Sequence, residues 1–184
     1  MKTLLATAGA FALLTTSMTN AADTNPAADA ISPLLAPWVG PYGGVPPFDQ
    51  VKVVDLKPGL ETGMAQQLAE IDRIANDPAA PTFENTIAAM ERAGRTLDRV
   101  GTVYGVYSST LNDEAVQAVE REMAPKLAAF SDQITQNPQL FGRIAKVYET
   151  RETSGLTPEQ QRLTWVYYTN FVRAGARLDA AGKK

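Results

Sequence analysis

The residue types that most often perform catalysis are scarce in this chain of 184 residues, which contains no histidine and no cysteine. Without histidine the sequence cannot form an HExxH zinc motif or a Ser-His-Asp triad. Without cysteine it has no thiolate nucleophile, disulfide or CxxC redox site. Hydroxyl groups and carboxylates are therefore the main candidates for nucleophilic, acid–base or metal chemistry.

These hydroxyl and carboxylate candidates all have a simpler structural interpretation. The hydroxyl run 108–110 lies near a predicted helix end, but a hydroxyl nucleophile needs an adjacent base. Acidic pairs two residues apart, such as Glu70 with Asp72 and Glu120 with Glu122, point to different faces of a helix and indicate a solvated surface. We therefore assign no catalytic residue and no metal ligand, and leave the substrate-binding residues unknown. A carboxylate-based hydrolase stays open as an alternative that only unpaired acids support.

Aromatic and sulfur-containing side chains could line a binding groove, but their spacing favours the core. A buried aromatic stripe with its hydroxyl groups at the rim is a common arrangement for tyrosine. Methionine at core positions fills gaps, so we do not predict haem ligands. The residues concerned are Tyr104, Tyr107, Tyr148, Tyr167 and Tyr168, with Met64, Met90 and Met123.

The charge distribution argues against a nucleic-acid partner. The formal net charge is −3, from 20 acidic and 17 basic residues, and no run of lysine and arginine interrupts the mixture of signs. Nucleic-acid modules normally carry a basic stripe because phosphate neutralisation drives their affinity. We expect no nucleic-acid partner and no cofactor held by this chain itself.

The N-terminus has the pattern of an export signal. Lys2 provides the positive charge, and the apolar run 4–14 is too short to span a bilayer. Small residues at Thr19 and Ala21 favour cleavage after Ala21, with cleavage after Ala22 as the second choice, so residues 1–21 are predicted to be a signal peptide. No cysteine follows for lipid attachment, and no later apolar run could span a membrane. We expect an exported, periplasmic protein without a stable membrane anchor.

Residues 22–54 are too rich in proline and glycine for a regular helix, with Pro41, Pro46 and Pro47 close together. The same stretch carries more apolar residues than a flexible linker would, including Leu34 and Trp38. We predict an extended strap that lies over a helical body.

From residue 55 to 184 apolar residues recur at the helical period, and no period-two alternation is sustained. The pattern predicts an all-α fold of about five antiparallel helices joined by short links. The expected helices are 56–76, 82–110, a third that Asn112 caps, a fourth that opens at Asn137 and a fifth that starts at Thr157.

Local signals set the expected helix ends. Asp55 is expected to cap the first helix with Pro58 in its first turn, and Gly155 is expected to close the fourth. Residues 157–160 form a capping box with proline at the first helical position. Nothing before Gly182 is expected to stop the fifth helix.

Glycine and proline inside two helices suggest special packing. Gly94, Gly101 and Gly105 fall near one side of the second helix, a spacing that suits close approach of a neighbouring helix. Pro125 falls inside the third helix, where we expect it to kink or split the helix.

An ordered series of short segments resembles the N-terminal part of the thimet oligopeptidase family of zinc metallopeptidases. The branch of peptidyl-dipeptidases, also called dipeptidyl carboxypeptidases, is the most similar. The resemblance extends from about residue 33 to 180. The matching segments include Gly44–Asp49, Pro58–Met64, Ala69–Ala75, Pro81–Ile87, Leu140–Phe141, Arg143–Ile144, Val147–Tyr148 and Phe171–Ala176.

The resemblance implies a part of a larger helical metallopeptidase fold. In the family these helices form one wall of a channel that admits short unfolded peptides, and the enzyme removes dipeptides from peptide C-termini. Zinc is bound there by an HExxH helix and a downstream glutamate in the C-terminal part, none of which occurs here. No catalytic or metal-binding residue can therefore be assigned by resemblance, and the chain alone is expected to be inactive.

Two interpretations of the chain remain open. It is either an N-terminal peptidase segment that lacks its C-terminal catalytic region, or a stand-alone exported module that binds peptides or a protein without catalysis. Trp165, Val166 and Tyr168 lie off the main apolar face of the fifth helix. Their exposure as one patch would favour the first interpretation.

Overall fold

The computed structural model describes residues 32–178, all of which belong to one compact unit. The predicted signal peptide, with its cleavage sites Ala21 and Ala22, lies outside these residues. So do the first residues of the predicted strap and the last six residues of the chain.

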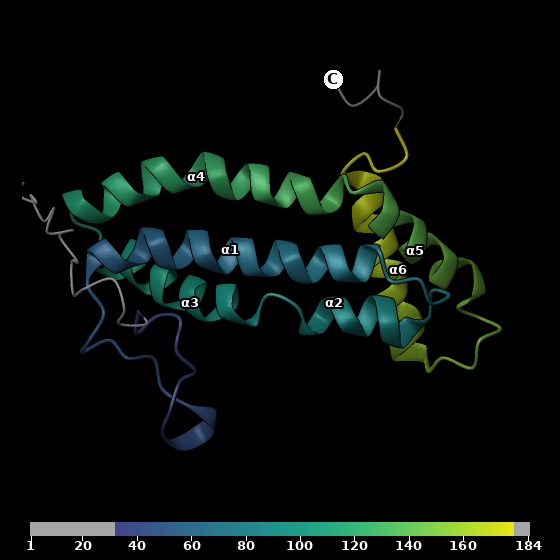
Figure 1. Ribbon diagram of the computed structural model, residues 1–184, viewed down its shortest axis with the longest axis horizontal. Helices are drawn as coiled ribbons and strands as arrows, with labels where there is room; N and C mark the ends of the chain where they lie inside the picture. The colour runs from purple at the N-terminus through teal and green to yellow at the C-terminus, as the bar shows by residue number, and fades with distance from the viewer. Residues whose placement is uncertain (1–31, 179–184) are drawn as a thin grey trace, which may run out of the picture. The chain divides into compact units, whose positions relative to one another are not determined.

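The described residues are all-α, which confirms the predicted fold class (Figure 1). Between residues 32 and 178 the backbone forms an isolated bridge between Val39 and Val45 but no strand. The helices are α1 (Val53–Ala75), α2 (Ala88–Arg92), α3 (Arg95–Thr110), α4 (Glu114–Thr135), α5 (Pro138–Thr150) and α6 (Pro158–Arg173). A 3-10 turn, η1 (Pro41–Gly43), and a π-helical turn, η2 (Phe83–Ile87), complete the elements.

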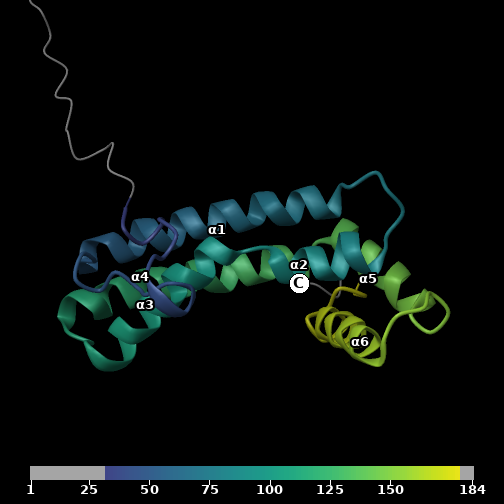
Figure 2. The same cartoon turned by 90° about the horizontal axis from the view of Figure 1, so that it is seen from below.

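Helix α1 contacts both α3 and α4, and the residue pairs give the directions. Along α1, Gly59 approaches Val100 and Gly63 approaches Leu97, so α3 is antiparallel to α1. Lys57 pairs with Glu122 and Glu61 with Lys126, so α4 is parallel to α1. Helix α6 packs on α5 and η2 and runs across the direction of α1 (Figure 2). Helices α1, α3 and α4 thus alternate in direction along the chain, as predicted, whereas α1 and α4 are parallel neighbours and α6 crosses α1.

Helix α1 begins three residues earlier than predicted. Lys52 is the N-cap, and Asp55 lies in the first turn, where its carboxylate accepts a hydrogen bond of 2.8 Å from the Lys52 backbone N–H. This bond is the half of a capping box that the N3 side chain supplies, and the Asp55 N–H donates to the Lys52 backbone carbonyl at 2.9 Å, so the helix starts here without Asp55 as the cap. Pro58 consequently lies inside the helix, not in its first turn.

The predicted helix 82–110 is wrong, because the chain breaks at Ala93 and Gly94. Ala93 is extended, and Gly94 has φ of 83°, a left-handed conformation that favours glycine. Glu70 Oε2 accepts a hydrogen bond of 2.7 Å from the Gly94 N–H, and a Cβ at Gly94 would lie 2.5 Å from the Gln67 side chain. Helices α2 and α3 are therefore separate elements that α1 holds together.

Of the three glycines predicted to allow close approach, Gly94 does approach α1, but Gly101 and Gly105 do not. A Cβ at Gly101 or Gly105 would meet nothing within 4 Å. On α1, by contrast, a Cβ at Gly63 would lie 2.9 Å from the Leu97 Cα, and one at Gly59 would lie 3.1 Å from Leu34. The glycines of α1, rather than those of α3, allow these two helices to pack closely.

Helix α4 differs from its prediction at two positions. Asp113, not Asn112, is the N-cap, and its carboxylate accepts a hydrogen bond of 2.9 Å from the Val116 N–H. Pro125 does not split the helix, which is continuous from Glu114 to Thr135. Pro125 is exposed, so water can bond the carbonyl of Arg121 that the proline leaves without an N–H partner.

The start of α5 is as predicted, whereas its end comes earlier. Asn137 caps α5 by accepting from the Leu140 N–H at 2.9 Å, with Pro138 at the first position. The helix ends at Thr150, and Gly155 lies beyond it in a turn with φ of 72°.

Helix α6 has the predicted start but an earlier end. Thr157 and Gln160 form the predicted capping box. The helix then stops at Arg173 because Gly175, with φ of 90°, donates to Val172 while Ala176 donates to Phe171. This is a Schellman motif, which the sequence analysis missed.

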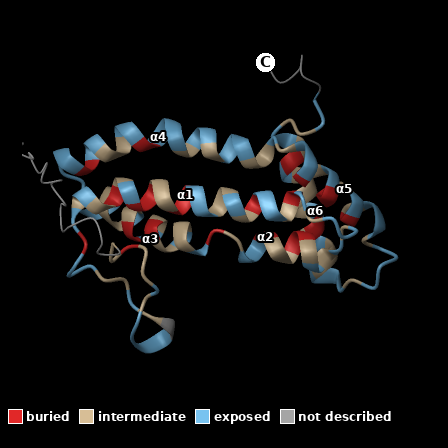
Figure 3. Cartoon of the chain, in the orientation of Figure 1, coloured by how far each residue is buried: buried red, intermediate tan, exposed pale blue. Residues whose placement is uncertain are grey.

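Two clusters of buried apolar side chains form the core (Figure 3). The first core cluster joins residues 32–52 to α1, α3 and α4, and the second joins α1, η2, α2, α5 and α6. Buried members of the first are Leu34, Val51, Leu56, Leu60, Met64, Val100, Val103 and Met123. Those of the second are Ile71, Ala75, Ile87, Met90, Leu140, Ile144, Val147 and Phe171.

Candidate functional site

The hydroxyl run at the end of α3 is used to satisfy its own helix. The Ser109 hydroxyl donates to the Gly105 carbonyl at 2.7 Å, and the Thr110 hydroxyl donates to the Val106 carbonyl at 2.6 Å. Such local bonds are ordinary for serine and threonine on helices. Nothing in this geometry prepares a nucleophile.

The acidic pairs named in the sequence analysis contact different partners. Glu70 accepts from the Gly94 N–H, whereas Asp72 accepts from the Asn76 side chain at 2.8 Å. Glu122 pairs with Lys57, and this hydrogen bond lowers the pKa of the Glu122 carboxyl. No three side chains of metal-ligating type come together within residues 32–178. These residues do not fit a zinc site, so no zinc-dependent step can be derived from them.

The tyrosines contribute to packing between helices. Tyr148 of α5 stacks on Tyr168 of α6 with ring centroids 3.9 Å apart, and the Arg151 guanidinium covers the Tyr148 ring at 4.0 Å. The Tyr107 hydroxyl donates to the Val51 carbonyl at 3.0 Å. Burial raises the pKa of Tyr104, and the nearby Glu120 carboxylate adds to the shift.

A second tyrosine contact connects α6 to α2. The Tyr167 hydroxyl donates to Glu91 Oε1 at 2.5 Å. Burial, followed by this hydrogen bond, raises the pKa of Tyr167 well above its ordinary value. The predicted methionines Met64, Met90 and Met123 are buried in the two core clusters.

A groove of about 460 Å³ lies between the C-terminal half of α1 and the η2–α2 segment, and we call it the α1–α2 groove. Three apolar side chains, Ile74, Ala89 and Ala93, contribute to its lining. Charged and amide groups complete the lining: Glu70, Arg73, Asp77, Glu84, Asn85 and Arg92. Hydrogen-bonding groups beside apolar ones are suited to an extended peptide, which presents both.

Arg143 of α5 fixes one end of the α1–α2 groove. Its side chain is 7% exposed, and its guanidinium donates to the carbonyls of Asp77 at 2.7 Å and Ala79 at 3.0 Å. The Asp77 carboxylate lies 3.5 Å from the same guanidinium. This clamp holds the loop after α1 and therefore the position of Asp77 in the groove lining.

Three other charged groups of the groove have partners, whereas Arg73, among the described residues, donates only to the Ala69 carbonyl of its own helix. Glu70 is fixed by the Gly94 N–H, and Arg92 pairs with Glu84 at 2.8 Å. The preceding turn is fixed by Thr82 and Asn85, whose side chains each accept a hydrogen bond from the other's backbone N–H, at 3.1 and 2.8 Å. Several groups of the groove lining are thus hydrogen-bonded within the chain, and the lining contains no pairing of base and nucleophile that would cleave a bond.

The sequence analysis missed this groove and its clamp. One residue indicated the clamp in the sequence. Arg143 is a cation on the same helix face as the apolar residues Leu140, Ile144 and Val147, which point into the core. A buried arginine needs several acceptors, which predicts a clamp but not its partner loop. The partner loop, residues 77–79, is known only from the tertiary structure, in which α5 packs beside the end of α1.

The three apolar residues that should distinguish the two interpretations do not form one exposed patch. Trp165 is 36% exposed and lies under the Arg162 guanidinium at 4.2 Å. Val166 and Tyr168 are half-buried. Within residues 32–178, none of the helices is long and apolar enough to cross a membrane.

Comparison with known proteins identifies relatives among peptidases. The chain is 37% identical over 147 residues to dipeptidyl carboxypeptidase of Salmonella typhimurium, covering 80% of the chain and 22% of that protein. It is 36% identical over 153 residues to the Escherichia coli dipeptidyl carboxypeptidase, covering 83% and 22%. A probable cytosolic oligopeptidase A of Arabidopsis thaliana is 21% identical over 137 residues, covering 73% and 19%. No family profile matches the chain.

The chain thus spans about a fifth of the length of these curated relatives. The matched part is most of this chain, and the relatives carry names of one group of peptidases. By this similarity, the chain is the counterpart of one segment of the dipeptidyl carboxypeptidases, which confirms the predicted resemblance to the thimet oligopeptidase family.

Proposed function

We propose that this chain is the N-terminal, channel-wall segment of an exported, periplasmic zinc metallopeptidase that removes dipeptides from the C-termini of short peptides. The observation that carries the proposal is its similarity to two dipeptidyl carboxypeptidases over at least 80% of its length. The segment corresponds to 22% of each relative, so the proposal assigns catalysis to the remaining part.

In this proposal the chain contributes binding surface and not bond cleavage. Zinc, bound by the remaining part, would polarise the scissile carbonyl and activate water. The α1–α2 groove supports a wall function because fixed carboxylate, guanidinium and amide groups line it beside apolar side chains. Such a surface can hold an extended peptide without cleaving it.

A stand-alone exported module that binds peptides or a protein is the second candidate. The observation that favours it is that the members of both core clusters all lie within the described residues, with α6 ending in the Schellman motif at Gly175. A helical unit of this kind could fold and bind without a catalytic partner.

The intact mass of the natural protein, recovered with an antibody to these helices, distinguishes the candidates. A species several times heavier than the 19.8 kDa precursor would support the peptidase segment. A species slightly lighter than 19.8 kDa would favour the stand-alone module. In parallel, the purified 184-residue chain should release no dipeptides from short peptides with added zinc. Release that a chelator abolishes would contradict the assignment of catalysis to the remaining part.

A further inference from the structure

Exposed apolar surface is concentrated in residues 39–48, which we call the apolar loop. Eight large apolar side chains are exposed in the described part of the chain, and four of them lie in this loop. These are Val39, Tyr42, Val45 and Phe48, and Val39 is 81% exposed. The loop contains no charged residue, although a fifth of the chain is charged. Its composition is therefore unlike that of the helix surfaces.

The tip of the apolar loop is held in one conformation. The Val45 N–H donates to the Val39 carbonyl at 3.1 Å, and the Gly44 N–H donates to the Pro41 carbonyl at 3.1 Å. Gly44 packs so tightly on Trp38 that a Cβ there would lie 2.6 Å from the Trp38 Cβ. Tyr42, with φ of 58°, occupies a left-handed conformation that is uncommon for residues other than glycine. A free linker would relax from this conformation.

Both sides of the apolar loop are anchored to the first core cluster. Leu34 precedes the loop and is fully buried, and Val51 follows it with its carbonyl bonded to the Tyr107 hydroxyl. The Arg99 guanidinium donates to the Leu35 carbonyl at 3.4 Å. Figure 1 shows η1, at the tip of the loop, clear of the helices. The loop is therefore a fixed projection that presents a fully exposed Tyr42.

We infer that the apolar loop docks into an apolar recess on the catalytic remainder of the peptidase, with Tyr42 as its central anchor. The inference rests on the proposed function. More than three quarters of each relative lies outside the matched segment, so these proteins have enough further chain to cover the loop. A partner surface that binds this loop must itself be apolar, because the loop has no charged group. A charge on the partner would therefore be buried without an opposite charge, which is costly. Tyrosine is a frequent anchor of such contacts because it buries a large area at little entropic cost.

A chimera tests the inference. In the Salmonella dipeptidyl carboxypeptidase, residues 32–178 of this chain replace the matched segment. Tyr42→Cys is introduced into the chimera and into the full 184-residue chain, and the rate of maleimide labelling at position 42 is measured by peptide mass spectrometry. Docking should slow labelling at least about tenfold in the chimera, because the thiol reacts only when the loop is released.

A matched pair of stability measurements provides the second readout. Tyr42→Ser should lower the melting temperature of the chimera and leave that of the 184-residue chain unchanged. Leu111→Ser, at another exposed apolar position, is the control for a general effect of the substitution. Circular dichroism of the 184-residue variants verifies that the helices are retained.

Each outcome separates the inference from the proposed function. A folded chimera that hydrolyses peptides, yet labels at position 42 as fast as the 184-residue chain, overturns the docking inference alone. A chimera without folded structure or activity contradicts the proposed function and the inference together. Slow labelling of the 184-residue chain that appears only at high concentration would identify a second copy as the occupant and overturn the inference.

Discussion

The first core cluster packs α1 against α3 over two glycines, whereas the second packs α5 and α6 around stacked aromatic rings and a buried arginine. In the first, backbone shape allows the helices to approach, and apolar side chains fill the remaining space. In the second, the Arg143 guanidinium bonds the loop after α1, and Tyr148 stacks on Tyr168. The first core cluster therefore depends on close packing of helices, and the second core cluster depends on directed polar contacts.

Under the proposed function, the difference assigns separate roles to the two ends of the described unit. Polar contacts of the second cluster fix Asp77, and Glu70 is fixed nearby by the Gly94 N–H, so the α1–α2 groove has defined hydrogen-bonding groups. The first cluster instead anchors the apolar loop through Leu34 and Val51. We therefore expect peptide contacts at the groove and protein contacts at the loop.

The largest predicted effect is the loss of the Arg143 clamp. Arg143→Met should lower the free energy of unfolding by about 3 kcal/mol, because the carbonyls of Asp77 and Ala79 lose their partner. Urea unfolding followed by circular dichroism measures the loss. Arg121→Met, on the exposed face of α4, is the matched control and should be near neutral. Equal stability of the two variants would show that the second cluster does not depend on the clamp.

Glycine packing in the first cluster should give the next largest effect. Gly63→Ala should lower the free energy of unfolding by about 2 kcal/mol, because the new Cβ would lie 2.9 Å from the Leu97 Cα. Gly101→Ala, with nothing within 4 Å, should raise stability by up to about 1 kcal/mol through helix propensity alone. The same sign for both variants in thermal unfolding would refute the assigned contact.

The Tyr167–Glu91 contact should give a smaller and pH-dependent effect. Tyr167→Phe removes this hydrogen bond and should lower the free energy of unfolding by about 1 kcal/mol near neutral pH. The folded-state pKa of Tyr167 is raised above its ordinary value of 10.0, so ionisation opposes folding. The stabilisation is present below pH 10 and decreases as the pH rises above 10.

Unfolding measured from pH 8 to 11.5 checks this sign. Stability of the unmodified chain should decline above pH 10 more steeply than that of Tyr167→Phe. Parallel curves for the two proteins would mean that the raised pKa of Tyr167 does not contribute.

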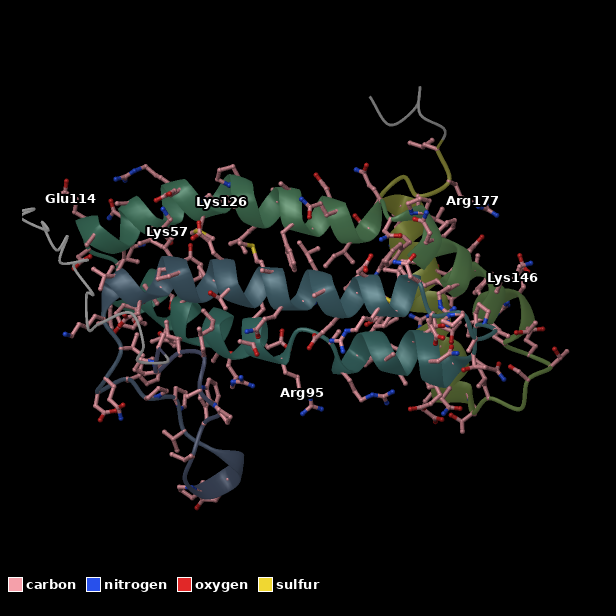
Figure 4. All side chains as sticks on the ribbon, viewed as in Figure 1. Lys57, Arg95, Glu114, Lys126, Lys146 and Arg177 are labelled. Atoms are coloured by element: carbon pink, nitrogen blue, oxygen red, sulfur yellow. The ribbon has the colours of Figure 1, made fainter. Side chains whose placement is uncertain are left out.

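The exposed ion pairs between α1 and α4 should give the smallest effect. Lys57 and Lys126 lie on the facing sides of these helices (Figure 4), where Lys126 pairs with Glu61 at 2.5 Å and both lysines pair with Glu122. Glu122→Gln should reduce the melting temperature only slightly, and added salt should remove the difference because exposed pairs are screened.

The sign of the acid dependence provides a second check on this variant. The pKa of Glu122 is lowered by its hydrogen bond to Lys57, so the stabilisation is present above pH 4.5 and decreases as the pH falls below 4.5. A melting-temperature difference that survives both acid and salt would contradict an electrostatic origin.

Much of the helical framework could be predicted from sequence because its signals are local. Apolar periodicity gave the all-α class and the core faces, and the Thr157 capping box gave the start of α6. Each of these depends on residues within a few turns of one another. The resemblance to thimet oligopeptidases also followed from sequence, since it depends on the order of short segments.

Tertiary contacts decided the helix break at Gly94, the close contacts between helices and the Arg143 clamp. Gly94 looked like one of three helical glycines, and only the Glu70 carboxylate on α1 makes its left-handed break favourable. The glycines that allow close approach were those of α1, because α3 turns Gly101 and Gly105 outward. Arg143 became a clamp when α5 packed beside the end of α1. Sequence thus determined where most helices form and the family that the chain resembles, whereas the helix break, the close contacts and the α1–α2 groove depend on partners distant in sequence.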